Sequence, residues 1–310
     1  MQFPGISDAL LRQRLTPPSG KVSIVLDTDT FNEIDDQYAL AYAIRSPEVM
    51  TLEAIYAAPF CQKNRSIEPP DGMEKSYEEI LRVLDRLAET GKRTVIRGAT
   101  SFMPGPAVPV ENAASRDLVE RAMRRSPSDP PLYVVAIAAI TDIASAILME
   151  PRIIERIVVL WLGGHSRDSH VTDEFNLIQD TNAARVIFDC GVPLVWVPCY
   201  GVASHLVTTM AELERDLGGR SAIGDYLIKI TGEHSNDHFA WGKVIWDIAP
   251  VAWLIHESSL PSRLAPSPVL APDAQWQEDA SRHLVREVTY IDRNWIFADL
   301  FRKLALAPKG

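Results

Sequence analysis

The sequence predicts a single α/β domain built on a mainly parallel, doubly wound open sheet with helices on both faces. Short apolar segments rich in β-branched residues alternate along the chain with segments of helical period. The 310 residues contain no internal repeat, low-complexity tract or obvious linker. Because strictly alternating strands and helices favour a parallel sheet, we expect residues 1–310 to form one domain, with residues 1–20 as an N-terminal extension.

Buried strands are predicted where short apolar runs occur, at residues 22–26, 52–58, 94–98, 132–139, 156–162 and 192–197. Helices are predicted at residues 38–44, 74–90, 117–125, 143–149, 181–190, 204–217, 223–231, 245–256 and 294–304. The helix at 143–149 must end before Pro151, and the helix at 181–190 ends before Gly191. Residues 68–73 and 99–110 contain proline and glycine and predict loops. The proline-rich residues 261–272 and the alternating residues 286–291 predict a late β appendage.

The composition excludes several classes of partner. The net charge of −10 has the wrong sign for a protein that tracks a nucleic-acid backbone or an anionic membrane surface. The three cysteines are widely spaced, so neither a zinc site nor a disulfide framework is predicted. The N-terminus lacks the pattern of a signal peptide, and no apolar run reaches membrane-spanning length. We therefore expect a cytoplasmic protein with a small-molecule partner.

The stretch from residue 21 to residue 45 carries the strongest chemical signal. A buried strand is followed there by four carboxylates, which belong to Asp27, Asp29, Asp35 and Asp36, and then by a helix. Acids at the carboxyl end of a strand lie where open α/β sheets bind ligands. Like charges packed together repel unless a cation or hydrogen-bond donors offset them, and Ca²⁺ prefers carboxylate oxygens. We expect a metal site; the alternative is a solvated acidic turn in which one acid caps the helix.

Five segments occur in order between residues 22 and 252: DTD…IDDQYALAYAI, AAITDIASAILMEPRI, VVLWLGG, TDEFNLIQDTNAA and WDIAP. Together they resemble the nucleoside hydrolase family of the inosine–uridine-preferring type, whose members are Ca²⁺-dependent N-ribohydrolases. The first segment departs from the family pattern DxDxGxDD by two extra residues, because TFNEI separates Asp29 from Asp35. The insertion lengthens the predicted metal loop.

The resemblance implies a role for each matching acid. Asp29 would contact Ca²⁺ and act as the base that takes a proton from the attacking water. Asp36 and Asp247 would be carboxylate ligands, and the backbone carbonyl of Thr141 would be a further ligand. Asp35 would accept a hydrogen bond from the ribose 2′-hydroxyl, and Asp247 would also contact the 3′-hydroxyl.

The resemblance also implies ribose contacts from later segments. Glu174 and Asn176 would hold ribose hydroxyls, and a strand-like backbone would point both side chains the same way; the alternative is that they cap the following helix. Asp168 stands where the family has an asparagine that reaches the 5′-hydroxyl. Asn64 is the candidate to replace a family asparagine that is missing after the second strand.

The leaving base requires a proton donor or an apolar, aromatic slot, and the chain differs from the family at this point. Trp246 stands where a histidine is expected before Asp247, and tryptophan can stack on a base or donate one hydrogen bond but cannot deliver a proton. His234 and His238, in a stretch that predicts a flap, are candidates to approach the leaving group; the alternative for each is a solvated side chain. His165 lies near a Gly-Gly pair at the same edge of the sheet, so its exposure to the site is a further option.

The expected reaction is hydrolysis of the N-glycosidic bond of ribonucleosides, which gives free base and ribose through an oxocarbenium-like sugar. One alternative is hydrolysis of another N- or O-riboside, and a second is a non-catalytic relative that binds ribose or a nucleoside. A metal-dependent phosphohydrolase is a weaker alternative, because the sequence shows no basic clamp for phosphate. The resemblance further implies a homodimer or homotetramer and a role in purine or pyrimidine salvage.

Overall fold

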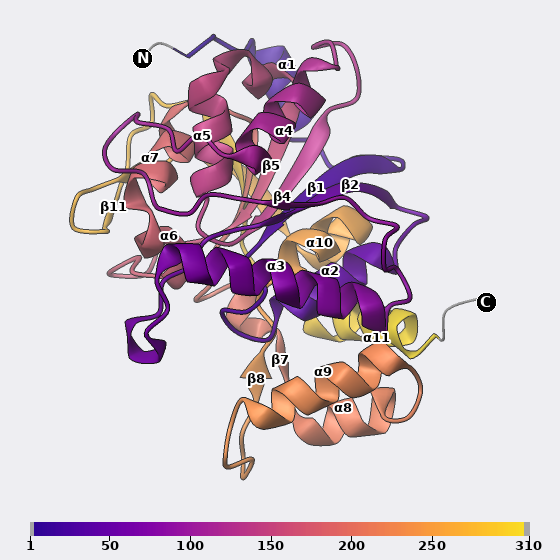
Figure 1. Cartoon of the computed structure of the whole chain (residues 1–310). Coiled ribbons are helices and arrows are strands. Elements are labelled where there is room, and N and C mark those ends of the chain that lie inside the picture. Colours follow the sequence, from indigo (N-terminus) through magenta and orange to yellow (C-terminus); the bar gives the residue numbers. More distant parts are fainter. Residues whose placement is uncertain (1–2, 307–310) are drawn as a thin grey trace.

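An eight-stranded sheet forms the centre of the protein in a computed structural model that describes residues 3–306 (Figure 1). The strand order is β3-β2-β1-β4-β5-β6-β12-β9, and β9 is the strand that runs antiparallel to its neighbour. The strands are β1 (Val22–Thr28), β2 (Met50–Ala57), β3 (Val95–Arg97), β4 (Leu132–Ile137), β5 (Ile157–Leu162), β6 (Leu194–Val197), β9 (Ser262–Pro266) and β12 (Leu284–Val288). The predicted α/β fold with a mainly parallel sheet is confirmed.

The strand order reverses next to β1. The chain first builds β1, β2 and β3 in one direction, and β4 then pairs with the free side of β1 before β5 and β6 continue in the other direction. The carboxyl ends of β1 and β4 therefore border the point where the crossover connections part to opposite sides. In open α/β sheets this point is where ligands bind.

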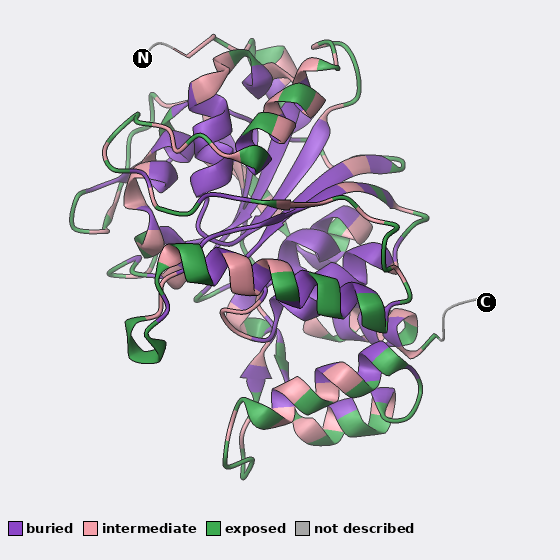
Figure 2. Cartoon of the chain, viewed as in Figure 1, coloured by how far each residue is buried: buried purple, intermediate pink, exposed green. Residues whose placement is uncertain are grey.

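Helices cover both faces of the sheet and form two hydrophobic cores (Figure 2). One face is covered by α2 (Asp36–Ile44), α3 (Pro69–Arg86), α8 (Met210–Leu217), α9 (Ala222–Glu233), α10 (Ile248–Ile255) and α11 (Arg293–Ala305). The other face is covered by α4 (Ala113–Met123), α5 (Thr141–Met149), α6 (Phe175–Gln179) and α7 (Thr181–Asp189). Among residues 3–306, no helix combines the length and apolar character needed to cross a membrane.

Helix α2 is enclosed on every side, which explains its apolar sequence. All nine of its residues are buried, because it packs against the sheet and also against α3, α9, α10 and α11. Its two tyrosines satisfy their hydroxyls inside the protein, Tyr38 with the Thr231 hydroxyl at 2.8 Å and Tyr42 by donating to Asp299 at 2.6 Å. The start of α2, where the acids lie, is therefore held in a fixed position.

The N-terminal segment packs against the domain near the amino end of β4. A short helix, α1 (Asp8–Arg14), ends in a buried arginine whose guanidinium donates to the backbone oxygens of Pro127 and Asp129. Leu15 follows it and is fully buried. Residues 8–15 are thus tied to the domain by both hydrogen bonds and apolar contact.

Several predicted element boundaries differ from the structure, and two predicted segments have a different secondary structure. Residues 204–217 do not form one helix, because β7 (Val207–Thr208) precedes α8 and pairs with β8 (Lys243–Val244). The side chain of Thr209 caps the start of α8, so the helix begins only at Met210. Residues 68–73 are not a loop, since α3 begins at Pro69; proline is favoured in the first helical turn, where its missing N–H is not needed.

The predicted β appendage is also wrong, because its two main strands extend the central sheet. β12 pairs in parallel with β6, and β9 pairs antiparallel with β12. A separate two-stranded sheet is formed by β10 (Val269–Leu270) and β11 (Trp276–Gln277). Buried Val285 and Val288 anchor β12, since the hydrophobic cores on the two faces of the sheet bury these two residues.

Phe188 provides a test of the packing beneath β5 and β6. Its ring lies among the rings of Trp161, Trp196 and Trp276, with centroids 5.1–5.7 Å apart. Phe188→Ala should leave a cavity there and lower the free energy of unfolding by about 3–5 kcal/mol, measured by urea denaturation followed by circular dichroism. The control is Phe239→Ala, since Phe239 is 89% exposed. Equal stability of the two variants would contradict this packing.

Candidate active site

A cavity of about 170 Å³ opens at the carboxyl ends of β1 and β4, where the strand order reverses. Part of its wall is acidic and consists of Asp29, Asp35, Asp36 and Asp247. All four side chains are buried, although they come from points more than 200 residues apart in the sequence. The remaining wall is formed by Asn32, Glu33, Ile137, Leu162, His165, Glu174, Phe175, Asn176, Cys199, Tyr200 and Trp246.

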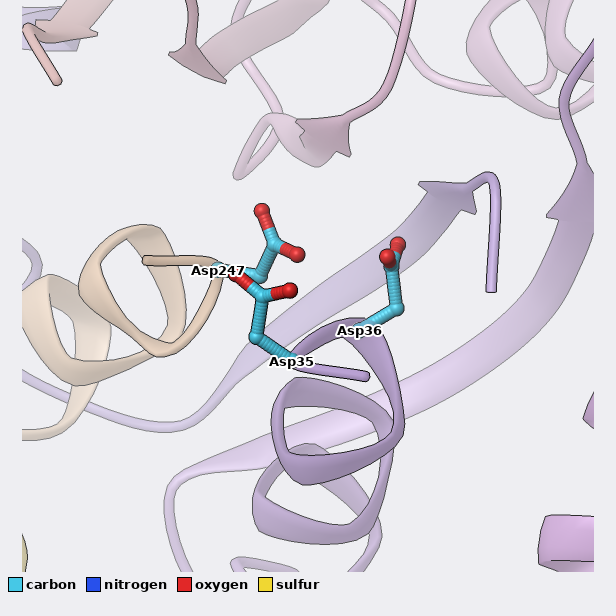
Figure 3. A group of neighbouring side chains, drawn as sticks. All are labelled: Asp35, Asp36 and Asp247. Atoms are coloured by element: carbon cyan, nitrogen blue, oxygen red, sulfur yellow. The ribbon is translucent and has the colours of Figure 1, made fainter. Parts of the chain in front are cut away.

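Two helix starts bring the acids together (Figure 3). Asp35 and Asp36 stand at the beginning of α2, and Asp247 stands at the beginning of α10. Among the described residues, one oxygen from each of these three carboxylates lies within 4.8 Å of the other two. Neither Asp35 nor Asp247 uses its side chain to cap its helix. Because the acids are buried and do not serve as caps, the alternative of a solvated capping turn does not hold.

Burial and mutual repulsion disturb the ionisation of the acids. Burial, with the neighbouring carboxylates acting in the same direction, holds the pKa of Asp29 and of Asp247 well above the usual range. The same causes raise the pKa of Asp36 to about 7, although a hydrogen bond from Thr28 opposes them. Burial also raises the pKa of Asp35, and Lys243 acts against this.

Several groups partly offset the repulsion. The Thr28 hydroxyl donates to Asp36 at 2.5 Å, and the backbone N–H of Trp246 donates to Asp35 at 3.0 Å. The Lys243 ammonium lies 4.0 Å from an Asp35 oxygen. The amino ends of α2 and α10 also carry partial positive charge, which favours nearby anions.

The donor set fits a hard divalent cation. One buried oxygen of Asp29, Oδ2, has no hydrogen-bond partner, and the carboxylates around it are oxygen ligands of the kind that Ca²⁺ and Mg²⁺ prefer. The structure brings Asp36 and Asp247 together as expected, with Asp35 as the third member of the close group and Asp29 in the same cavity. Thr141 is buried and donates its hydroxyl to Asp180 at 2.8 Å, so its side chain is engaged elsewhere.

The first carboxylate of the acidic stretch lies outside this cavity. Asp27 is fully buried in β1 and is absent from the cavity wall. Its neighbour is Asp142, whose charge adds to burial in raising the pKa of Asp27 well above the usual range. The acidic stretch therefore contributes three of its four aspartates to the cavity.

The two-residue insertion lies at the rim and does not separate the acids. The backbone oxygen of Asn32 accepts a hydrogen bond from Arg65 at 2.9 Å, and Glu33 forms an ion pair with the ammonium of Lys243. The lengthened loop is thus tied on one side to the segment after β2 and on the other to β8. Both Asn32 and Glu33 contribute to the cavity wall.

Glu174 and Asn176 reach the cavity, but not from a strand. Glu174 caps α6, and its carboxylate accepts hydrogen bonds from the backbone N–H groups of Gly164, Asn176 and Leu177 at 2.8–3.0 Å. Asn176 donates its side-chain amide to the Leu162 carbonyl at 3.1 Å. Because Asn176 lies inside α6, a strand-like backbone is not found; the capping alternative holds for Glu174 alone, and both side chains line the cavity.

Five residues that were expected at the site do not line the cavity, and the buried Thr141 is one of them. Asp168 and Asn64 are exposed and lie outside the wall, Asn64 beside a different hollow near α9. His234 is exposed beside that same hollow, and His238 is exposed with its ring 3.0 Å from the Gly232 carbonyl. These four are exposed on the surface: Asn64 lies in a short 3-10 helix, and His234 directly follows α9.

Sequence reasoning missed part of the wall. Cys199 and Tyr200 follow β6 and so reach the same edge of the sheet as the acids. The Cys199 thiol is buried beside Glu174, and burial raises the pKa of that thiol well above its usual range. The signal was available, because both residues directly follow a strand that was predicted to be parallel. Trp246 does line the cavity, as expected.

Comparison with known proteins gives the same picture. Residues 24–289 match the model of the inosine-uridine preferring nucleoside hydrolase family. The chain is 25% identical to a probable uridine nucleosidase 2 of Arabidopsis thaliana over 69% of this chain and 70% of that protein. It is 27% identical to a pyrimidine-specific ribonucleoside hydrolase of Salmonella arizonae over 75% of this chain and 79% of that protein.

Solved structures agree on the fold. A plant nucleoside hydrolase matches with a TM-score of 0.72 at 18% identity over 93% of this chain and 99% of that one. A purine-preferring ribonucleoside hydrolase from Gardnerella vaginalis matches with a TM-score of 0.72 at 19% identity over 91% of this chain and 98% of that one. The family match covers more than half of this chain, and the matched residues include the strands of the central sheet and the acids of the cavity. This chain therefore belongs to the inosine-uridine preferring nucleoside hydrolase family.

Proposed function

We propose that the protein hydrolyses the N-glycosidic bond of ribonucleosides in a Ca²⁺-dependent reaction that releases free base and ribose. As a member of the family it is an N-ribosyl hydrolase. The observation that supports the finer proposal is the convergence of Asp29, Asp35, Asp36 and Asp247 on one cavity beside Glu174 and Asn176. This arrangement provides both a cation site and several acceptors for a sugar.

Asp29, Asp36, Asp247 and the backbone carbonyl of Thr141 would hold the ion. When bound, Ca²⁺ supplies a positive charge that makes a nearby water easier to deprotonate. Asp29 has a buried oxygen without a hydrogen-bond partner. We infer that this oxygen takes the proton from the attacking water as general base.

The remaining polar groups bind and stabilise the sugar. Asp35 accepts a hydrogen bond from the 2′-hydroxyl in this proposal, and Glu174 and Asn176 hold other ribose hydroxyls. As the bond to the base breaks, positive charge grows on the ribose ring, as in glycoside hydrolysis generally. Buried carboxylates beside the ring stabilise that charge, because little water is present to screen it.

A riboside with another aglycone is the second candidate substrate. It is favoured by Trp246 in the cavity wall and by Asp168 in solvent, since both positions depart from the family pattern. The homodimer or homotetramer, the cytoplasmic location and the role in purine or pyrimidine salvage stay predictions. Light scattering coupled to size-exclusion chromatography tests the first of them.

Release of free ribose tests the function directly. Wild-type protein with Ca²⁺ should release ribose from uridine or inosine, measured by a reducing-sugar assay with chromatography of the free base. Dialysis against EDTA should abolish turnover and added Ca²⁺ should restore it, because the carboxylates need the cation to act together. Full activity after exhaustive dialysis would contradict the metal assignment. Turnover of synthetic ribosides but of no common nucleoside would favour the second candidate.

Replacement of the base tests the role of Asp29. Asp29→Asn should lower kcat by about 10²–10⁴-fold, since the amide cannot accept the proton of water. The rate is measured at saturating Ca²⁺, so that weaker ion binding does not account for the loss. Asp273→Asn is the matched control, because Asp273 is exposed and lies outside the cavity wall. Unchanged kcat in Asp29→Asn would exclude this residue as the base.

The stability of the ion-free protein should depend on pH. In the folded state the pKa of Asp36 is about 7, above its ordinary value of 3.8. The folded state therefore holds a proton that the unfolded state releases, and stability should fall as pH rises from about 4 to about 7. Ca²⁺ competes with this proton, so its stabilising effect should be larger above that window.

Thermal unfolding measures this effect. At saturating Ca²⁺ the Tm should rise by about 5 °C at pH 8 relative to EDTA, and by clearly less at pH 5. Differential scanning fluorimetry with Mg²⁺ in a parallel series shows whether the effect depends on the ion. An equal rise in Tm at both pH values would contradict this prediction, because it would mean that cation binding does not depend on the ionisation of these acids.

A further inference from the structure

One wall of the cavity offers a hydrogen-bond donor to the leaving base. Breaking the N-glycosidic bond leaves the bonding electrons on the base nitrogen, so negative charge must be stabilised there. Trp246 cannot deliver a proton, and His234 and His238 lie outside the wall. The wall nevertheless contains one histidine, His165, directly after the Gly163-Gly164 pair that follows β5.

The backbone on both sides of this imidazole is fixed by hydrogen bonds. The backbone N–H of His165 donates to the Thr172 hydroxyl at 2.6 Å, and its carbonyl accepts from the Trp276 indole at 2.9 Å. The ring packs against the ring of Tyr200, with centroids 4.5 Å apart. With 9% of its side chain exposed, His165 has little freedom to leave the cavity wall.

The hydrogen bonds assign the position of the imidazole proton. The backbone N–H of Tyr200 donates to Nδ1 of His165 at 3.4 Å, so Nδ1 acts as the acceptor. In a neutral imidazole the other nitrogen, Nε2, then carries the proton. Burial lowers the pKa of His165, while Asp173 acts in the opposite direction, so the neutral form predominates at neutral pH.

The Nε2–H group is available to a ligand. Nε2 makes no hydrogen bond to any of residues 3–306. The atom is also absent from the set of buried side-chain atoms that lack a partner, so it is not fully enclosed. A carboxylate oxygen of Asp173 lies 3.9 Å away, beyond hydrogen-bond distance, and that side chain is 68% exposed. An acceptor atom of a ligand can therefore replace water at Nε2.

Two further aromatic rings continue the same wall. Tyr200 packs between His165 and Trp246, and its ring meets that of Trp246 edge to face with centroids 5.8 Å apart. The three residues line the cavity together with the carboxylates. The cavity thus combines an acidic part that suits a sugar and a cation with an uncharged aromatic part that suits a planar base.

We propose that His165 is a catalytic residue that donates its Nε2–H to the leaving base, while Tyr200 and Trp246 contact the base ring. This role rests on the proposed function. In the step, the C1′–N bond breaks and its electrons pass to the base, the water oxygen bonds to C1′, and Asp29 receives the water proton. The donor bond stabilises the charge on the base, which gains its own proton from water on release. The ligand class is a planar base with an oxygen or nitrogen acceptor conjugated to its glycosidic nitrogen.

Two substitutions and two kinds of substrate test this role. His165→Phe keeps the aromatic volume but removes the donor, and His165→Gln supplies an amide donor in a similar position. For uridine and inosine, kcat should fall by about 10²-fold in His165→Phe, as for removal of one donor to a developing anion. For p-nitrophenyl ribofuranoside the fall should stay within roughly fivefold, because p-nitrophenolate needs little stabilisation to leave.

Controls and contrary outcomes separate the alternatives. His165→Gln should recover at least about tenfold of the lost nucleoside kcat. The matched control is His205→Phe, because His205 is exposed and lies outside the cavity wall; Tm and circular dichroism verify the fold of all variants. Equal losses of kcat for both kinds of substrate, or an unchanged nucleoside kcat in His165→Phe, would overturn the role of His165 but not the proposed function. A wild type that releases ribose from no riboside would overturn the proposed function itself.

Discussion

The structure depends on one electrostatic constraint: Asp29, Asp35, Asp36 and Asp247 share a small volume from which water is largely excluded. Charges so close together repel strongly in a medium of low dielectric constant. The protein offsets part of this repulsion with two helix amino ends, the Thr28 hydroxyl, a backbone N–H and the Lys243 ammonium. Burial, together with the remaining repulsion, raises the pKa of each acid, so the protein groups offset these effects only in part. A bound cation would complete it, so stability and function are coupled at this site.

The topology of the sheet explains why these acids can meet. Because β1 lies between β2 and β4, the connections on its two sides diverge and leave a crevice at the carboxyl edge. The acidic loop after β1 borders this crevice, and α10 packs against α2, β4 and β5 so that its amino end faces the same space. The extra residues of the acidic loop are taken up at the rim, where Glu33 pairs with Lys243. The close group of carboxylates is therefore compatible with the longer loop.

The cavity divides into two chemical parts that come from different kinds of segment. Asp35, Asp36 and Asp247 stand at the starts of α2 and α10, and their positions follow from the packing of these helices on the sheet. Asp29 directly follows β1. His165, Tyr200 and Trp246 instead belong to loops that follow β5, β6 and β8. Loops at the edge of a rigid scaffold can vary without loss of the core. In the proposed reaction, the fixed geometry of the sheet and its buried helices would thus serve the sugar, while the loops would decide which base is accepted.

The sequence by itself determined the alternating strands and helices, the parallel sheet and the presence of Asp29, Asp35 and Asp36 at a strand end. These features follow from local periodicity, because strands buried on both faces must be continuously apolar. Only the tertiary structure decided which loop residues share the cavity: it brought in the ring of His165 and left Asp168, Asn64, His234 and His238 outside. The paths of loops depend on long-range packing and backbone hydrogen bonds, such as the bond from Tyr200 to His165, and no local pattern encodes them.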